Sequence, residues 1–157
     1  SARANIRLTW SSRDQNPTFN PVIIEPNLGP ESLAVIQGNN ADALSALTQT
    51  HLAQAALVYL DPPFFTGRQH LLVQRSKDAD GRPERTLSQG FDDRWENLEH
   101  YLDELWPRLV LARNLLCDDG SLVLHVDPKT SHYVKILLDE LFGSECFASE
   151  IIWRYRR

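Results

Sequence analysis

An aspartate and two prolines follow a short apolar run near the middle of the chain, in the stretch AALVYLDPPFFTG at residues 55–67. Asp61 closes the run, Pro62 and Pro63 come next, and Phe64 follows them. Asp-Pro commonly opens a plain turn, so the motif alone favours a turn and a reaction centre about equally. The types and the order of these residues suit one kind of chemistry.

That chemistry is methyl transfer to an exocyclic nucleobase amine, whose lone pair is delocalised into the ring. A catalyst can free the lone pair by accepting hydrogen bonds from both N–H groups. The carboxylate of Asp61 can accept one. The carbonyl of Pro62 can accept the other, because Pro63 restricts Pro62 to an extended conformation. Phe64 can then stack on a base that has swung out of its duplex, and rigid prolines hold the reactants in line.

The segments around this motif alternate between strand and helix. Short apolar runs predict strands over 33–38, 56–60, 121–127 and 149–156. Helical spacing of apolar residues predicts helices over 41–55, 97–120 and 129–143, with Pro107 kinking or splitting the second. The polar segment 68–94 contains Asp80-Gly81, a turn signal between two strand-like runs, and is predicted to form a hairpin or loop.

Apolar strands separated by amphipathic helices predict an α/β fold, with a mostly parallel sheet and helices on both faces. In such sheets the chemistry lies beyond the carboxyl ends of the strands. Asn39, Asp61 and Asp127 all follow or close predicted strands, so we expect them at one edge. His125 lies two residues before Asp127 and should leave the same face of the strand. We regard both as possible supporting residues behind the site.

These segments resemble the permuted, beta-type S-adenosylmethionine-dependent DNA amino-methyltransferases, a family that includes adenine-N6 enzymes and type III modification subunits. The resemblance rests on VIQGNNADALSAL, LVYLDPPFFTG, GFDDRW, the long segment from Tyr101 to Gly143, and FASEIIWRYRR, which follow in the family's order and spacing. It implies a partial Rossmann-like methyltransferase fold. Residues 33–157 would form part of the catalytic domain, preceded by an irregular arm over 1–32.

The resemblance also implies a donor, a target and site residues. The donor is S-adenosylmethionine, and the target is adenine N6 in double-stranded DNA, reached by base flipping. An aspartate before the two prolines favours adenine, since cytosine-N4 enzymes of the family often carry serine there; a cytosine-N4 enzyme remains the alternative. The implied catalytic residues are Asp61, Pro62, Pro63 and Phe64, and the implied donor-binding residues are Asn39, Asp61, Phe65 and Thr66.

The sequence departs from the family pattern at two kinds of position. Asn39 stands where the family usually has aspartate, and Phe65 where it often has asparagine, so each removes a polar contact near the donor. The glycine-rich donor-binding loop and the target-recognition region, which follow in the permuted order, are absent from these residues. We therefore expect an N-terminal catalytic part that is inactive alone. Its expected partners are DNA, the remaining C-terminal half, and a second copy or a restriction subunit. A non-catalytic remnant or interaction module is the rival.

Composition sets the outer limits. The chain has 157 residues, 42% of them apolar, which suits one domain with an ordinary core. A formal charge of −5 argues against a protein that coats nucleic acid. The segment from Arg68 to Gly90 is nevertheless locally basic, with five basic and three acidic residues. Cys117 and Cys146 lack the partners of a metal cluster, and no apolar run is long enough to cross a membrane. We expect a cytoplasmic protein without a metal site.

Overall fold

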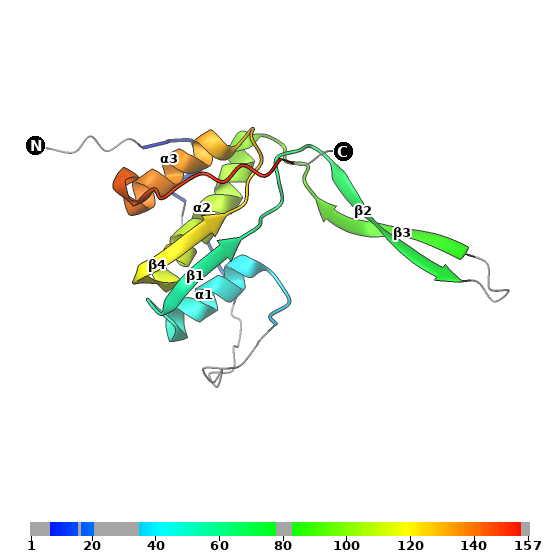
Figure 1. Cartoon of the computed structure of the whole chain (residues 1–157), viewed down its shortest axis with the longest axis horizontal. Coiled ribbons are helices and arrows are strands. Elements are labelled where there is room, and N and C mark those ends of the chain that lie inside the picture. The colour runs from blue at the N-terminus through cyan, green and yellow to red at the C-terminus, as the bar shows by residue number, and fades with distance from the viewer. Residues whose placement is uncertain (1–6, 16, 21–34, 78–82, 155–157) are drawn as a thin grey trace, which may run out of the picture.

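The computed structural model of the chain describes residues 7–15, 17–20, 35–77 and 83–154. The elements are α1 (Asn40–Thr50), β1 (Ala55–Leu60), β2 (Gln69–Lys77), β3 (Pro83–Asp92), α2 (Leu98–Leu115), β4 (Leu116–Leu124), α3 (Ser131–Phe142) and the short 3-10 helix η1 (Ser144–Cys146). Figure 1 shows a body of helices and a small sheet, from which β2 and β3 project as a long ribbon.

The strands form two separate sheets. β1 and β4 pair in parallel, in register from Leu57 with Ser121 to Leu60 with Leu124, and β2 pairs with β3 antiparallel. The β1–β4 register shifts just after Ala55, where the two backbones approach closely. A Cβ on Gly120 would lie 2.7 Å from the carbonyl oxygen of Ala55, so this position requires glycine. The parallel pair makes the chain α/β, and the larger Rossmann-like arrangement stays a prediction.

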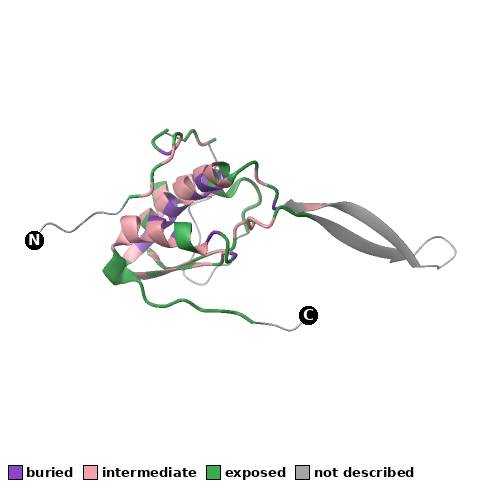
Figure 2. Ribbon diagram, turned by 90° about the horizontal axis from the view of Figure 1, so that it is seen from above, coloured by how far each residue is buried: buried purple, intermediate pink, exposed green. Residues whose placement is uncertain are grey.

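One core joins α2, α3 and the inner face of the β1–β4 sheet. Its buried side chains belong to the two helices: Tyr101, Leu102, Leu105, Leu109, Val134 and Leu137. Leu60 of β1 and Leu122 and Leu124 of β4 pack against this cluster. Figure 2 shows the buried positions concentrated along these helices. Burial of these apolar side chains therefore fixes the carboxyl ends of β1 and β4 relative to α3.

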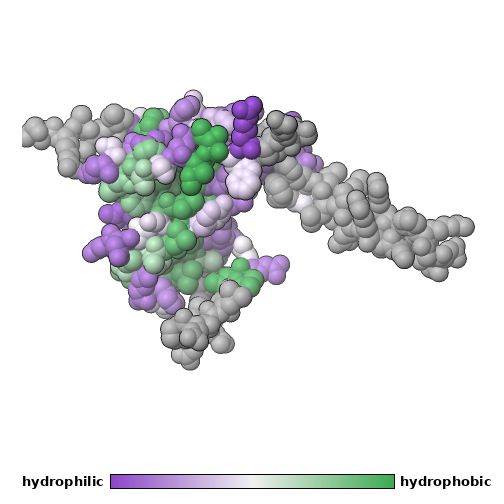
Figure 3. Space-filling model, viewed as in Figure 1, coloured by the Kyte–Doolittle hydropathy of each residue, from purple (hydrophilic) through white to green (hydrophobic). Residues whose placement is uncertain are grey.

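The other face of the β1–β4 sheet is open. Leu57 and Tyr59 alternate with the inward residues of β1, and each is 60% exposed; Val123 of β4 is 39% exposed. Figure 3 shows apolar surface on this side of the molecule. The prediction of helices on both faces is therefore wrong for the described residues, in which this sheet is covered on one face.

The remaining element predictions divide clearly. The helices over α1 and α3, strand β1 and the β2–β3 hairpin are confirmed, while the turn at Asp80-Gly81 lies outside the described residues. Residues 35–38 and 149–154 are not strands. Val35 and Ile151 are 89% and 84% exposed, and an apolar run becomes a strand only where another strand satisfies its backbone groups. The sequence alone could not show that such a partner is missing among the described residues.

The second helix and its following strand are shifted from the prediction. α2 ends at Leu115 rather than near Gly120, because Leu116 pairs with Ala55 of β1 and begins β4. Pro107 lies inside α2 and does not split it. β4 in turn ends at Leu124, three residues before Asp127. Tertiary pairing thus overrides the local helix-ending signal of two aspartates and a glycine.

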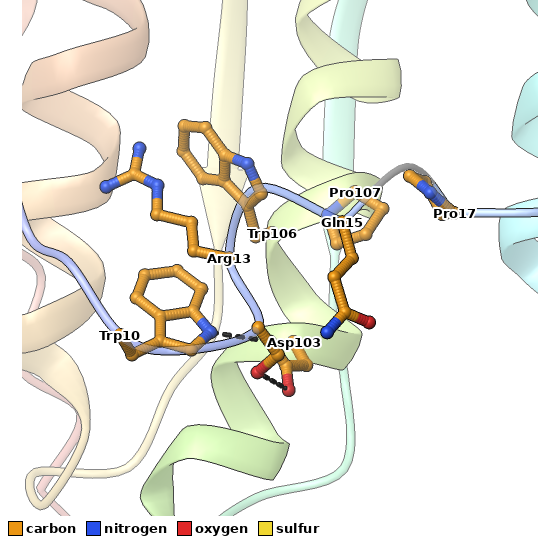
Figure 4. A pocket seen from close by; sticks show the side chains of 8 residues that line it. Trp10, Arg13, Gln15, Pro17, Asp103, Trp106 and Pro107 are labelled. Atoms are coloured by element: carbon orange, nitrogen blue, oxygen red, sulfur yellow. Dashed lines mark hydrogen bonds between the residues drawn. The ribbon is translucent and has the colours of Figure 1, made fainter.

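Residues 7–15 of the N-terminal arm contain no helix or strand and pack on α2 and α3. The indole of Trp10 and the hydroxyl of Ser12 donate to the carboxylate of Asp103 in α2. Arg13 is buried and pairs with Glu140 of α3. Figure 4 shows Trp10, Arg13 and Asp103 beside Trp106 of α2. The arm therefore connects the two helices that form the core.

Neither a membrane span nor a metal cluster occurs in the part of the chain that the structure describes. None of its helices is both long and apolar enough to cross a bilayer. No group of three histidine, cysteine, aspartate or glutamate side chains in it is arranged to hold a metal ion.

Candidate active site

Asp61 and His125 leave the sheet side by side. β1 ends at Leu60 and β4 ends at its register partner Leu124, so the next residue of each strand lies at the same edge. The backbone N–H of His125 donates to the carbonyl of Leu60 at 2.9 Å. Nδ1 of His125 lies 3.1 Å from Oδ1 of Asp61, and the two side chains are 51% and 59% exposed. The carboxylate is thus open to a ligand and has an imidazole partner.

The loop after Asp61 is held by Asp93 and Trp95, which follow the ribbon. The N–H of Phe64 donates to Oδ1 of Asp93 at 2.9 Å, and the hydroxyl of Thr66 donates to Oδ2 at 3.1 Å. The indole N–H of Trp95 donates to the carbonyl of Phe64 at 3.2 Å. Asp93 is only 1% exposed. The peptide groups on both sides of the Phe64 Cα are therefore fixed by side chains.

Asp127 holds the same loop from the side of α3. Its Oδ2 accepts the N–H of Phe65 at 2.6 Å, and its Oδ1 accepts the N–H groups of Lys129 and Thr130 at 2.6 and 3.2 Å. Asp127 is 8% exposed, whereas the side chain of His125 is 51% exposed. The prediction that both leave the same strand face is wrong, because β4 ends at Leu124 before the alternation reaches them.

The two phenylalanines of the loop face different surroundings. The ring of Phe64 meets the ring of His125 edge-on, with centroids 4.9 Å apart. The ring of Phe65 meets buried Tyr101 edge-on at 5.8 Å and packs against the core. Phe64 therefore lies on the Asp61 side of the loop, where an aromatic base could stack, while Phe65 anchors the loop.

A cavity of about 460 Å³ lies next to the loop, between the start of α1 and α2. Pro62, Pro63 and Asn39 line it together with Trp95 and Arg108. Asn39 is the N-cap of α1: its Oδ1 accepts the N–H of Ala41 at 2.9 Å and Nη2 of Arg108 at 3.3 Å. Nε of Arg108 donates to Oδ1 of Asn40 at 2.7 Å.

The volume and the lining of the cavity suit a charged nucleoside such as S-adenosylmethionine. Its volume falls in the usual range for small-molecule sites, which is about 300–1,000 Å³. Its lining combines an indole, two prolines, side-chain amides, the carboxylate of Glu104 and the guanidinium of Arg108. Apolar walls with a few polar groups of both signs suit an aromatic ligand that carries a carboxylate together with cationic ammonium and sulfonium groups.

The structure thus brings Asn39, Pro62 and Pro63 together around one cavity beside Asp61. The remaining predicted residues, Phe65, Thr66 and Asp127, hold the loop, and whether any of them contacts a ligand stays a prediction. Sequence reasoning missed Asp93, Trp95 and Arg108. The first two lie within the segment GFDDRW, whose acidic and aromatic residues were a signal, but nothing in the sequence indicates which segment they contact.

The buried phenol of Tyr101 should make the stability of the chain depend on pH in the alkaline range. Burial raises the pKa of its phenol above the ordinary value of 10.0; Thr130 opposes this rise, and the charges of Asp127 and Asp93 add to it. The unfolded chain ionises this group near pH 10, whereas the folded chain keeps it neutral, so the free energy of unfolding should fall as pH rises above about 10. We expect Tyr101→Phe to reduce this alkaline loss, measured by urea unfolding of both proteins at neutral pH and at about pH 11.

Comparisons with known proteins give one consistent result. A family model described as DNA methylase matches residues 55–157. The chain is 25% identical over 134 residues to the Mod subunit of the type III restriction-modification enzyme EcoP15I of Escherichia coli, covering 76% of this chain and 20% of the relative. It is 34% identical over 119 residues to the type II methyltransferase M.EcaI of Enterobacter cloacae, covering 76% and 23%. The chain spans about a fifth of the length of these relatives.

Proposed function

The chain belongs to the DNA methylase family, and we propose that it is the catalytic portion of an S-adenosylmethionine-dependent methyltransferase acting on the exocyclic N6 of a flipped adenine in DNA. The observation that carries the proposal is the placement of Asp61. Its carboxylate lies at the carboxyl edge of the parallel strands, 59% exposed and 3.1 Å from His125, whose ring meets the ring of Phe64. The next two residues, Pro62 and Pro63, line the cavity.

In this proposal the residues of the chain prepare the amine for attack. Asp61 accepts one N–H of the adenine amine and the carbonyl of Pro62 accepts the other, which moves the nitrogen towards tetrahedral geometry. Phe64 stacks on the extruded base. When bound, S-adenosylmethionine supplies an electrophilic methyl group. Holding the amine in line with that methyl is a positioning effect, and the two prolines restrict the loop that provides it.

His125 has a supporting role in the same proposal. Formation of the N–C bond would be matched by breaking of the bond between the methyl carbon and the donor's sulfur, which would depart as a neutral thioether. The amine nitrogen would then carry one proton too many, and that proton must depart. Asp61 is already hydrogen-bonded to the amine and can receive it. With Nδ1 of His125 at 3.1 Å from Oδ1, the imidazole orients the carboxylate and offers a route for the proton to solvent.

Features of the sequence and of the described surface suit several partners. DNA is the proposed substrate, and the basic residues of the segment from Arg68 to Gly90 suit contact with phosphate. The open face with Leu57, Tyr59 and Val123 suits cover by further methyltransferase chain, since the relatives are about five times as long. Several relatives are Mod subunits of type III restriction-modification enzymes, so a second copy or a restriction subunit is a further proposed partner.

The test is product analysis with the full-length gene product. Unmethylated DNA is incubated with S-adenosylmethionine carrying a tritiated methyl group, and the modified nucleosides are separated. We expect N6-methyladenine, and we expect the 157-residue chain alone to give none, because it spans only about a fifth of the length of these methyltransferase relatives. N4-methylcytosine as product would establish the cytosine alternative. Absence of both products and of donor binding by calorimetry would leave a non-catalytic interaction module.

A further inference from the structure

Asp93 is the most deeply buried carboxylate among the described residues, at 1% exposure. A charged side chain is stable at such depth only when polar groups satisfy it. Its two oxygens accept the N–H of Phe64 and the hydroxyl of Thr66, both in the loop that follows Asp61. This buried carboxylate is therefore bound to the candidate catalytic loop through hydrogen bonds to both of its oxygens.

The backbone of Asp93 is tied to the same loop. Its N–H donates to the carbonyl of Arg68 at 2.9 Å, and its carbonyl accepts the N–H of Gly67 at 3.0 Å. These bonds continue the pairing of β2 with β3 from the ribbon into the loop. Asp93 thus stands where the projecting ribbon joins the segment that carries Asp61.

Phe64 is fixed on both sides as a result. Asp93 accepts its N–H, and the indole of Trp95 donates to its carbonyl. With both peptide groups held, the direction of the Phe64 side chain is set, and its ring stands edge-on to His125 at 4.9 Å. His125 in turn lies 3.1 Å from Asp61. A chain of direct contacts therefore runs from Asp93 to the proposed catalytic carboxylate.

We propose that Asp93 is a positioning residue, which holds the Phe64 peptide so that the Phe64 ring and Asp61 keep the spacing that methyl transfer requires. This inference rests on the proposed function. Asp93 is called a positioning residue, because it is not placed in contact with either substrate. In this proposal Asp93 acts by accepting the hydrogen bonds of Phe64 and Thr66. Asparagine can accept the Phe64 N–H with its oxygen and donate to the Thr66 hydroxyl with its amide, so it should replace aspartate, whereas alanine should not.

The kinetic test uses the full-length gene product and four variants. Asp93→Ala should lower kcat by about 10²-fold, since small misplacements of reacting groups have effects of this size, and should leave KM for DNA nearly unchanged. Asp93→Asn should stay within about threefold of the wild type. Thr66→Val, which removes the hydroxyl contact to Asp93 and keeps the Phe64 contact, should fall between them. Asp42→Ala is the matched control, because Asp42 is also a buried carboxylate, 7% exposed, but it binds Asn20.

A second measurement examines the contact itself in the 157-residue chain. Hydrogen exchange at the Phe64 amide should be slow in the wild type, Asp93→Asn and Asp42→Ala, and faster in Asp93→Ala, because only the last leaves this N–H without its acceptor. Equal exchange in all four proteins would overturn the inference. So would a kcat of Asp93→Asn as low as that of Asp93→Ala, or a kcat loss in Asp93→Ala no larger than in Asp42→Ala.

These two measurements separate the failure of the inference from the failure of the proposed function. Fast exchange in Asp93→Ala together with a wild-type protein that transfers no methyl group would support the hold on Phe64 and reject the methyltransferase. An active wild type with unaltered exchange and unaltered kcat in Asp93→Ala would support the methyltransferase and reject the positioning role.

Discussion

Asp61→Ala is expected to lower kcat for methyl transfer to DNA by about 10²–10³-fold in the full-length protein, the range found when one hydrogen-bonding group of a preorganised site is removed. The carboxylate is the side-chain acceptor that the proposed mechanism gives to the target amine. Without it, only the carbonyl of Pro62 remains to accept a hydrogen bond from the amine, and the other N–H has no acceptor in the proposed mechanism. Because the side chain is 59% exposed and pairs with the half-exposed His125, the loss should be one of activity and not of folding.

Asp118→Ala provides the matched control for Asp61→Ala. Asp118 is also an exposed aspartate and belongs to strand β4 of the same sheet. It lies near the start of β4, whereas Asp61 lies beyond the carboxyl ends of the strands. It should retain wild-type kcat, and both variants should retain the wild-type melting temperature. Tritium incorporation into unmethylated DNA measures the first quantity and circular dichroism the second. An Asp61→Ala protein that keeps more than about a tenth of wild-type kcat would contradict the assigned role.

The sequence was sufficient for the elements that specify themselves locally. α1 and α3 carry apolar residues at helical spacing, and Gly143 at φ 92° ends α3 as a C-terminal glycine does. Strand β1 is an apolar run that ends at Leu60 and is followed by the polar residue Asp61. Elements that depend on a distant partner were predicted less well. Residues 116–120 were predicted to end the helix and instead begin β4, where Leu116 pairs with Ala55 of β1. The run with Ile151 does not form a strand in the described residues.

The candidate site shows the same division. Asp61, Pro62, Pro63 and Phe64 are consecutive, so their types and order indicate a chemistry from the sequence alone. The partners that hold them come from other parts of the chain: Asp93 and Trp95 lie 29 and 31 residues from Phe64, and His125 reaches Asp61 through β4. Hydrogen bonds of this kind depend on how two segments meet in space. Neither hydrophobic periodicity nor motif spacing contains that information.

Arg13→Ala is expected to destabilise the chain by about 3 kcal/mol, a large part of the 5–15 kcal/mol that is usual for a domain. The Arg13 side chain is 2% exposed and pairs with Glu140, whose side chain is 24% exposed. The guanidinium also lies over the rings of Trp106 and Trp10, with centroids 4.3 and 5.2 Å away. Figure 4 shows the three side chains. Removing the cation would leave the Glu140 carboxylate largely buried without this partner and would open a void between two indoles.

Arg7→Ala is the control for this prediction, since Arg7 belongs to the same arm and also lies near Glu140, at 3.6 Å, but is 47% exposed. An exposed ion pair contributes at most about 1 kcal/mol. Urea unfolding followed by tryptophan fluorescence measures both variants, and the indoles beside Arg13 report directly on release of the arm. A loss below about 1 kcal/mol for Arg13→Ala would mean that the arm does not stabilise α2 and α3. A loss near 3 kcal/mol that Arg13→Met with Glu140→Leu recovers would assign it to the lost Arg13 pair of Glu140 and the void together, because apolar pairs of similar size can replace buried ion pairs.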